Sequence, residues 1–289
     1  MNLLNVVSPE DTSAEPEVIV VDTKQSAGWI DLRELWRYRG LVWVFAFRDI
    51  TVRYRQTVVG IAWTVLQPLS LMLALSLFKK MIVTTPEKGT IPEPVKLLCG
   101  LVLYQLFAAI INASTLCLVD NRQMLTKVYF PRLVLPLAAS LRPLIDFGIG
   151  LGVLILMMLW FQIWSSVAMI LAPLVVVTTG LVALGFGLWL SALNAHYRDF
   201  GHVVPFALQL GLIVSPVAVD SSHVTGGWRW LYFMNPMATL LDLFRWTMLG
   251  ITPSLGWSEI LVSLISATFL LLSGAWYFRR VDRFLADSI

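Results

Sequence analysis

Charged residues are scarce in this 289-residue chain, at 13% of positions, whereas apolar residues reach 57% and the mean hydropathy is +0.76. Soluble globular domains average roughly 25% charged and 45–50% apolar residues, so the composition excludes a soluble fold. The two cysteines fall 18 residues apart in one apolar run, which on a helix separates them by about 27 Å and excludes a disulfide within the chain. Disordered, collagen-like and disulfide-stabilised classes are excluded as well, and we predict an all-α integral membrane protein.

Motifs for catalysis or nucleotide binding are also missing. The sequence contains no GxxxxGK[ST] phosphate loop, no HExxH, no GxSxG and no cysteine–histidine spacing typical of zinc. His196, His202 and His223 do not cluster, which argues against a membrane enzyme such as a polyprenyl-phosphate transferase or an O-acyltransferase. We therefore expect no catalytic residue, metal or cofactor in this chain. Uphill transport would draw on an ion gradient or on a separate ATPase.

Six apolar runs are long enough to cross a bilayer core of about 30 Å, which needs about 20 helical residues. They are residues 58–78, 97–119, 137–161, 167–193, 203–219 and 257–278, of which the fifth is the shortest. Before them, segment 31–56 places Leu32, Leu35 and Trp36 on one helical face and arginines on the other, which predicts an amphipathic interface helix. Residues 1–28 are acidic and are predicted to form a disordered cytosolic tail, leaving 29–289 as one transmembrane domain.

Lys and Arg are sorted between the connections of these six spans. Fifteen fall on the side of the N-terminus and six on the opposite side, so the positive-inside rule predicts that both termini are cytosolic. The outer connection 220–256 is 37 residues long and half apolar, with an Asn235-Pro236 break before a helical stretch too short to cross. It predicts a re-entrant or interfacial helical segment. We find no internal repeat, which argues against inverted-repeat transporters.

Charges inside the predicted spans are few. Asp146 lies in the third span, with Arg142 one helical turn before it, so the two can form an ion pair. A structural pair, or an Arg142 that reaches the cytosolic surface, is favoured over a role in translocation. An ion-coupled secondary transporter stays an alternative, although it would be expected to carry more intramembrane carboxylates.

The connection between the second and third spans predicts a docking element. Asn121 can cap a short helix that ends before Pro131, with mixed polar and apolar faces. An ordinary loop that obeys the positive-inside bias is the alternative.

Four stretches, in order along the chain, resemble the Wzm-like membrane subunits of bacterial ABC-type polysaccharide exporters, the type-2 ABC permeases. They are residues 47–57 with 60–68, residues 127–132 with 135–137, residues 187–194 with 197–199, and Ser215-Pro216-Val217 followed by residues 235–237. The resemblance extends from about residue 35 to 280. It departs at Ala218-Val219-Asp220, where an aromatic residue and a proline are expected.

The resemblance implies a homodimer of six-span permeases in the bacterial inner membrane with two Wzt-like ATP-binding-cassette subunits, which bind ATP and Mg. The implied cargo is an undecaprenyl-linked polysaccharide, O-antigen first, with capsular polysaccharide or teichoic acid as alternatives. It assigns a coupling helix against the ATPase, with the contact residues Asn121, Arg122, Met124, Lys127, Tyr129 and Arg132. A second ATPase contact is implied at Tyr197, Arg198 and Asp199, where capping or a loop ion pair is an equal alternative.

A polysaccharide path needs aromatic faces and hydrogen-bonding groups, because sugar rings present C–H faces and hydroxyl edges. The candidates lie in the first two spans and the outer segment: Trp63, Gln67, Tyr104, Gln105, Asn112, Trp228, Trp230 and Tyr232. Aromatic residues also populate membrane interfaces without any substrate. Arg53 and Arg55 precede the first span and could attract the lipid pyrophosphate, or equally the headgroups of anionic phospholipids.

Overall fold

The computed structural model describes residues 32–55, 60–82, 91–128, 130–163, 167–217, 228–253 and 255–288, and these contain helices and no strand. The predicted tail 1–28 lies outside the described residues, so the domain boundary after it stays a prediction. In chain order the helices are α1 Leu32–Arg37, α2 Arg39–Arg55, α3 Gly60–Ile82, α4 Glu93–Asp120, α5 Arg122–Leu125, α6 Val134–Trp160, η1 Val167–Leu171, α7 Ala172–His196, α8 Phe200–Val214, α9 Trp228–Phe233, α10 Pro236–Leu249 and α11 Trp257–Ser288.

Five of the described helices are long and apolar enough to span a membrane, and they match five of the six predicted runs. The remaining run, predicted at 203–219, corresponds to α8, which has 15 residues and a length of about 22 Å. It ends before Ser215 and Pro216, because proline cannot continue the hydrogen-bond ladder. The helical membrane fold predicted from the sequence is confirmed, with one apolar helix shorter than expected.

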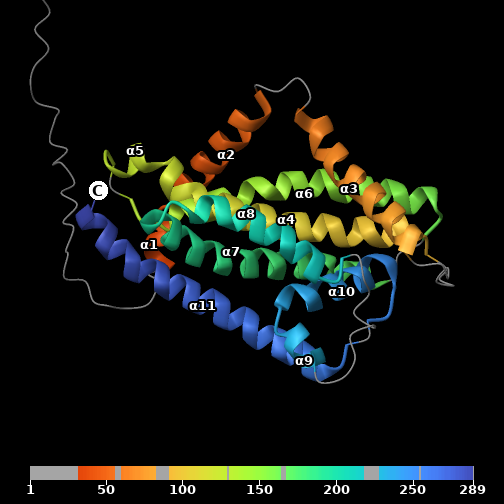
Figure 1. Ribbon diagram of the computed structural model, residues 1–289. Helices are drawn as coiled ribbons and strands as arrows, with labels where there is room; N and C mark the ends of the chain where they lie inside the picture. Colours follow the sequence, from red (N-terminus) through yellow and green to blue (C-terminus); the bar gives the residue numbers. More distant parts are fainter. Residues whose placement is uncertain are drawn as a thin grey trace, which may run out of the picture.

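Helix α4 forms the centre of the bundle (Figure 1). It packs against α3, α6, α7, α8 and α10. Its side chains supply much of the main core, including Leu98, Leu101, Leu103 and Ile110, none more than 1% exposed. Prolines occur in its first turn, whereas α3 and α6 carry Pro68 and Pro143 inside the helix. A run of 28 residues without an internal break thus provides the support for the surrounding helices.

Helices α4, α7 and α11 approach closely because glycines stand where they meet. A Cβ at Gly187 would lie 2.6 Å from the Cβ of Ser114 in α4, and a Cβ at Gly185 would lie 2.9 Å from the Cα of Leu271 in α11. Trp189 stacks on Tyr277 with 4.2 Å between ring centroids. Small residues that let helix backbones approach are typical of packing inside membranes, where lipid gives no hydrophobic drive between helices.

Helix α10, which follows the predicted Asn235-Pro236 break, is almost wholly buried. The Asn235 side chain accepts a hydrogen bond from the Met237 backbone N–H at 3.1 Å, and Pro236 occupies the first turn. The helix stops at Gly250, whose φ of 70° favours glycine. Its 14 residues give about 21 Å, too short to cross a bilayer.

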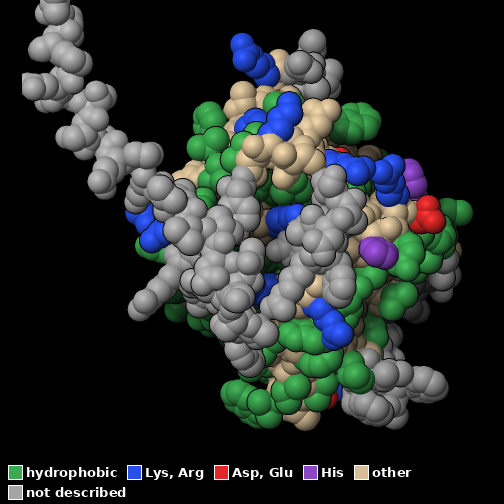
Figure 2. Space-filling view, turned by 90° about the vertical axis from the view of Figure 1, so that its left-hand side faces the viewer, with side chains coloured by type: hydrophobic (Ala, Val, Ile, Leu, Met, Phe, Trp, Pro, Cys, Tyr) green, Lys and Arg blue, Asp and Glu red, His purple; other side chains and the backbone are tan. Residues whose placement is uncertain are grey.

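Helices α2 and α3 pack against α6, and the C-terminal end of α2 and the N-terminal end of α3 project from the bundle on that side (Figure 1). The helix α5, α1 and the C-terminal end of α11 lie together at one end of the molecule. Figure 2 shows this end, with Lys and Arg side chains spread over it and little acidic surface. This distribution agrees with the side that the positive-inside rule assigns to the cytosol.

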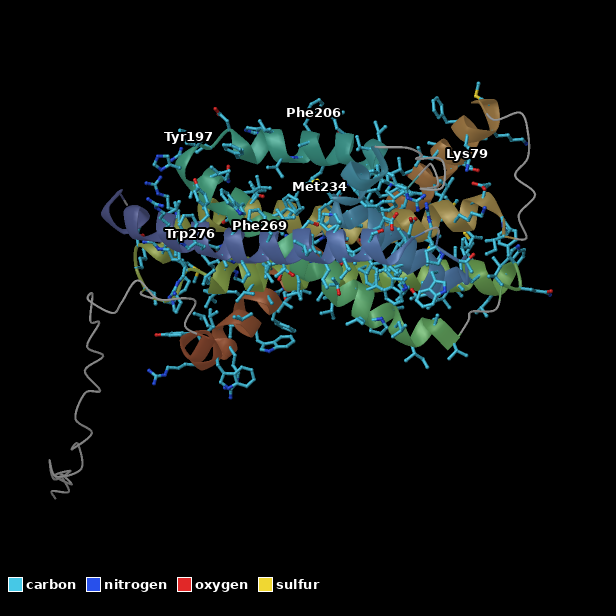
Figure 3. All side chains as sticks on the ribbon, turned by 90° about the horizontal axis from the view of Figure 1, so that it is seen from below. Lys79, Tyr197, Phe206, Met234, Phe269 and Trp276 are labelled. Carbon is cyan, nitrogen blue, oxygen red and sulfur yellow. The ribbon has the colours of Figure 1, made fainter. Side chains whose placement is uncertain are left out.

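The lateral surface is apolar, as expected for contact with lipid. Phe206 of α8 and Phe269 of α11 are 62% and 68% exposed. Figure 3 shows Tyr197 and Trp276 near one end of the bundle and Lys79 toward the other. Aromatic residues near helix ends are typical of membrane interfaces.

Candidate functional site

The first cavity lies between the end of α2 and helices α3, α4 and α6, with a volume of about 570 Å³. Five residues predicted from the sequence for the substrate path or its lipid entrance line it: Arg53, Trp63, Gln67, Gln105 and Asn112. They come from α2, α3 and α4, and they are brought together because α3 packs against α4 and α6 while α2 packs against α6. The cavity thus combines the aromatic rings of Tyr54, Trp63 and Phe147 with several hydrogen-bonding groups, as sugar recognition requires.

Asp146 of α6 is held at the cavity wall by two residues of α2. The Arg53 guanidinium lies 3.0 Å from Oδ2, and the Tyr54 hydroxyl donates to Oδ1. Spacing within α6 predicted an ion pair between Arg142 and Asp146. Among the described residues, Asp146 pairs with Arg53 instead, which corrects that expectation. The reason is that α2, nearly a hundred residues earlier, delivers a cation and a phenol to this carboxylate.

The Tyr54 phenol keeps its proton and donates a hydrogen bond at physiological pH. Burial, together with its hydrogen bond to Asp146, raises the pKa of Tyr54 to about 12. A raised tyrosine pKa means that the folded state favours the neutral form. The contribution of this bond to stability is present below the ordinary pKa of about 10 and is lost as the pH rises through 12.

Two further polar groups of the first cavity are donors. Gln105 Nε2 and Arg142 Nε are buried and have no hydrogen-bond acceptor among the residues described. A buried donor without an acceptor costs about 1–3 kcal/mol. A ligand or water that brings acceptor oxygens into this cavity is therefore stabilised there.

A second cavity of about 660 Å³ adjoins the first and leads toward α5. The two share the lining residues Arg53, Asn112 and Arg142, so they form one groove. At its far end the second cavity is lined by Arg48, Asp49, Asp120 and Asn121. The groove thus runs from the basic end of the molecule to the polar residues between α3 and α4.

Helix α5 forms where the sequence predicted a docking helix, but it is shorter. It ends at Leu125 rather than at Pro131, and beyond it the backbone turns, with Lys127 N–H donating to Met124 O at 3.1 Å. Asn121 does not cap it, because its Nδ2 donates to Cys117 O and its Oδ1 accepts from Arg48. Arg122, Met124 and Lys127 are exposed, Arg132 is half-buried, and Tyr129 lies outside the described residues.

The predicted second contact, Tyr197, Arg198 and Asp199, forms the turn between α7 and α8. All three are exposed, and Tyr197 contacts the His196 ring edge-on. Asp199 stands before α8, yet its side chain makes no capping hydrogen bond. The capping alternative therefore loses support, and the turn presents polar side chains to its surroundings.

Tyr104 and Tyr232, two more of the predicted path residues, are not among the described lining of the groove. Tyr104 of α4 donates its hydroxyl to Leu208 O of α8 at 2.6 Å. Tyr232 of α9 is half-buried, and its pKa is raised by burial and by the nearby Asp242 carboxylate. The side chains of Trp228 and Trp230 lie outside the described residues. Arg55 is exposed at the end of α2 and is absent from the described lining of either cavity.

Sequence reasoning missed Arg48 and Tyr54. Arg48 bonds to Asn121, and Tyr54 to Asp146, over separations of 73 and 92 residues. One signal was available: a carboxylate deep in a span needs a partner, and α2 offers several cations close to the membrane. Spacing within one helix favoured Arg142 instead.

The comparison with protein families agrees with this geometry. A bundle of apolar helices with a polar groove is the architecture of an integral membrane protein, and the family match identifies it as part of a transporter. The chain belongs to the family described as ABC-2 type transporter, whose model matches residues 40–249. The resemblance found in the sequence motifs is thereby confirmed.

Similar curated proteins narrow the class further. The chain is 29% identical over 217 residues to an O-antigen export system permease protein RfbA of Myxococcus xanthus, covering 74% of this chain and 82% of that protein. It is 24% identical over 249 residues to an O-antigen export system permease protein RfbA of Klebsiella pneumoniae, covering 86% and 94%. A second Klebsiella pneumoniae protein of that name matches to the same extent.

Proposed function

We propose that this chain is the permease subunit of an ATP-driven exporter that carries a lipid-linked polysaccharide, O-antigen first, across the bacterial inner membrane. The observation that carries the proposal is the groove in which Trp63, Gln67, Gln105 and Asn112 meet. The family and the names of the similar permeases support the class of cargo. Capsular polysaccharide and teichoic acid are alternative cargoes for the same groove.

The proposed assembly is a homodimer with two ATP-binding-cassette subunits, which supply ATP and Mg binding. The exposed α5 and the turn at residues 197–199 lie at the end where such subunits would dock. The proposed topology has six spans, of which the shortest combines α8 with the turn at residues 215–217, and α9–α10 is an outer re-entrant segment. Both termini are proposed to lie in the cytosol. The basic surface at the α5 end supports this orientation.

The lipid pyrophosphate is proposed to reach the groove past Arg53 and Arg55 from the cytosolic leaflet. Arg55 is exposed at the end of α2, two residues after Arg53, which lines both cavities. Contact of these arginines with anionic phospholipids is the alternative. An ion-coupled secondary transporter is the less supported function, because the carboxylate that lines the first cavity, Asp146, is already held by Arg53 and Tyr54.

Purification of the tagged chain from its native host tests the assembly. We expect a subunit with a GxxxxGK[ST] loop to co-purify and to hydrolyse ATP. Substitution of the exposed Arg122, Met124 and Lys127 by alanine should reduce its recovery at least tenfold, because these side chains form the proposed docking face. The control is Trp257→Ala, which changes an exposed side chain outside this face. A folded chain that purifies without an ATPase would contradict the proposal.

Filling the first cavity tests the path. Ala109 of α4 lines it, and Ala109→Phe is expected to lower polysaccharide export at least tenfold because the ring occupies the space between α3 and α6. Export is measured as surface polysaccharide in cells, and assembly as co-purification of the ATPase. The control Val177→Phe places the same ring on an exposed position of α7. Normal export by an assembled Ala109→Phe variant would show that the cargo does not pass through this cavity.

A further inference from the structure

Helix α2 contacts the coupling segment, residues 121–132, on both sides of α5. Before and within α5, the Arg48 guanidinium donates to Asn121 Oδ1 at 2.7 Å and to Met124 Sδ at 3.2 Å. After α5, the Phe45 ring packs on the Phe130 ring with 5.5 Å between centroids. Both rings are buried, at 4% and 5% exposure. These contacts hold the coupling segment to α2.

The same helix holds the wall of the first cavity. Arg53 and Tyr54 occupy both carboxylate oxygens of Asp146 in α6. Arg53 lies about 7.5 Å further along α2 than Arg48, because a helix rises 1.5 Å per residue. One continuous helix of 17 residues therefore connects the coupling segment to a carboxylate on the cavity wall.

The Asp146 contact should persist when α2 moves. Asp146 lies twelve residues into α6, about 18 Å from its first residue, and its side chain is 18% exposed. Separation from Arg53 would leave a charge without its partner in a membrane span, which is costly. The energetically cheaper response is that α6 follows α2.

Resting on the proposed function, we propose that α2 is the link that transmits movement of the coupling segment to the cavity. Displacement of α5 by the partner ATPase acts through Phe45 and Arg48 on α2, and through Arg53 on Asp146. Arg48, Arg53 and Asp146 are then positioning residues that act in series. If α2 served only as a membrane-surface anchor, Arg48 and Arg53 would act independently.

The experiment uses the complex with its ATPase in vesicles and measures lipid-linked polysaccharide exported per ATP hydrolysed. Each of Arg48→Ala, Arg53→Gln and Asp146→Asn is expected to lower this ratio at least tenfold. The double variant Arg48→Ala/Arg53→Gln is expected to match the stronger single variant, because the two contacts lie in series. Arg39→Ala is the matched control: Arg39 lies on the same helix, where its guanidinium covers the Trp36 ring and donates to Trp36 O, and the ratio should not change.

Asp146→Asn separates the link from binding of pyrophosphate by Arg53. Loss of the carboxylate releases Arg53, so a role limited to anion binding predicts an unchanged or higher ratio. A charge exchange, Arg53→Asp with Asp146→Arg, is expected to recover the ratio to within about threefold of the unmodified complex, since the pair forms again in reverse. All ratios are taken on the assembled, monodisperse fraction, so that loss of folded protein does not enter them.

Two results would overturn the proposal that α2 transmits the movement. In the first, the fold reductions in the ratio caused by Arg48→Ala and Arg53→Gln multiply in the double variant. In the second, Asp146→Asn leaves the ratio unchanged. Failure of the proposed function looks different: the unmodified chain would bind no ATPase or export no polysaccharide. The substitutions are tested only after the unmodified complex has met both conditions.

Discussion

Gly274→Val is expected to detach α11 from α7 and to lower the melting temperature of the purified chain by about 10 °C, the shift that a destabilisation of about 3 kcal/mol gives in a chain of this size. A Cβ at Gly274 would overlap the backbone carbonyl of Gly185 and lie 3.0 Å from a ring carbon of Trp189. A backbone carbonyl inside a helix cannot move aside as a flexible side chain can. The α11 helix must therefore shift as a whole.

Such a shift removes more than one contact. The stack of Trp189 on Tyr277 and the hydrogen bond from Trp189 Nε1 to Ser273 Oγ, at 3.1 Å, both depend on the close approach of α7 and α11. Lost aromatic and hydrogen-bond contacts add to the cost of the overlap. The measurement is thermal unfolding in detergent, with size-exclusion chromatography as a check on the folded fraction.

The matched control is Gly148→Val in α6, where an added Cβ meets nothing within 4 Å. It makes the same change in helix propensity without the overlap, so its melting temperature should stay close to that of the unmodified chain. Equal melting temperatures for the two valine variants would contradict the role given to the α7–α11 approach.

Arg245→Ala is expected to destabilise the chain by about 3–5 kcal/mol, because it removes a cationic partner of the buried Asp242 carboxylate. Arg245 and Asp242 of α10 are 4% and 7% exposed, with 3.9 Å between Nη1 and Oδ1. Arg245 Nη2 also donates to Val217 O at 2.7 Å, in the turn after α8. The substitution thus loses both an ion pair and the bond that joins α10 to this turn.

The double variant Arg245→Met/Asp242→Leu provides the comparison. It removes both charges and keeps apolar volume, so it should regain most of the lost stability, since a buried ion pair can often be replaced by apolar packing. Thermal unfolding of the single and double variants measures the difference. A double variant as unstable as Arg245→Ala would mean that the bond to Val217, rather than the buried charge, dominates.

The five long spans could be predicted because a helix needs about 20 apolar residues to cross the bilayer, and such runs can be recognised from local composition alone. The run predicted at 137–161 is α6, Val134–Trp160, and the run at 97–119 is α4, Glu93–Asp120. Local composition could not show that α8 stops before Pro216, because apolar residues continue beyond it. Turn chemistry, not hydropathy, sets that end.

The site could be predicted less completely. Trp63, Gln67, Gln105 and Asn112 were predicted from the sequence to line the substrate path. The structure brings these four residues to one cavity. The pairing of Asp146 with Arg53 could not be read from spacing, because it depends on where α2 lies relative to α6. Tyr104 carries the same chemistry as the cavity residues, yet its rotamer directs the hydroxyl to α8.

The internal prolines of α3 and α6 make these two walls of the groove less stiff than the wall formed by α4. Pro143 lines the first cavity and has no N–H to donate to the carbonyl of Ala139, which lines the second. Pro68 removes the corresponding bond in α3, whereas α4 keeps its ladder from the second turn onward. Bending therefore costs less free energy in the two outer walls than in the central one, and a change in the groove's width is accommodated by α3 and α6 around a rigid α4.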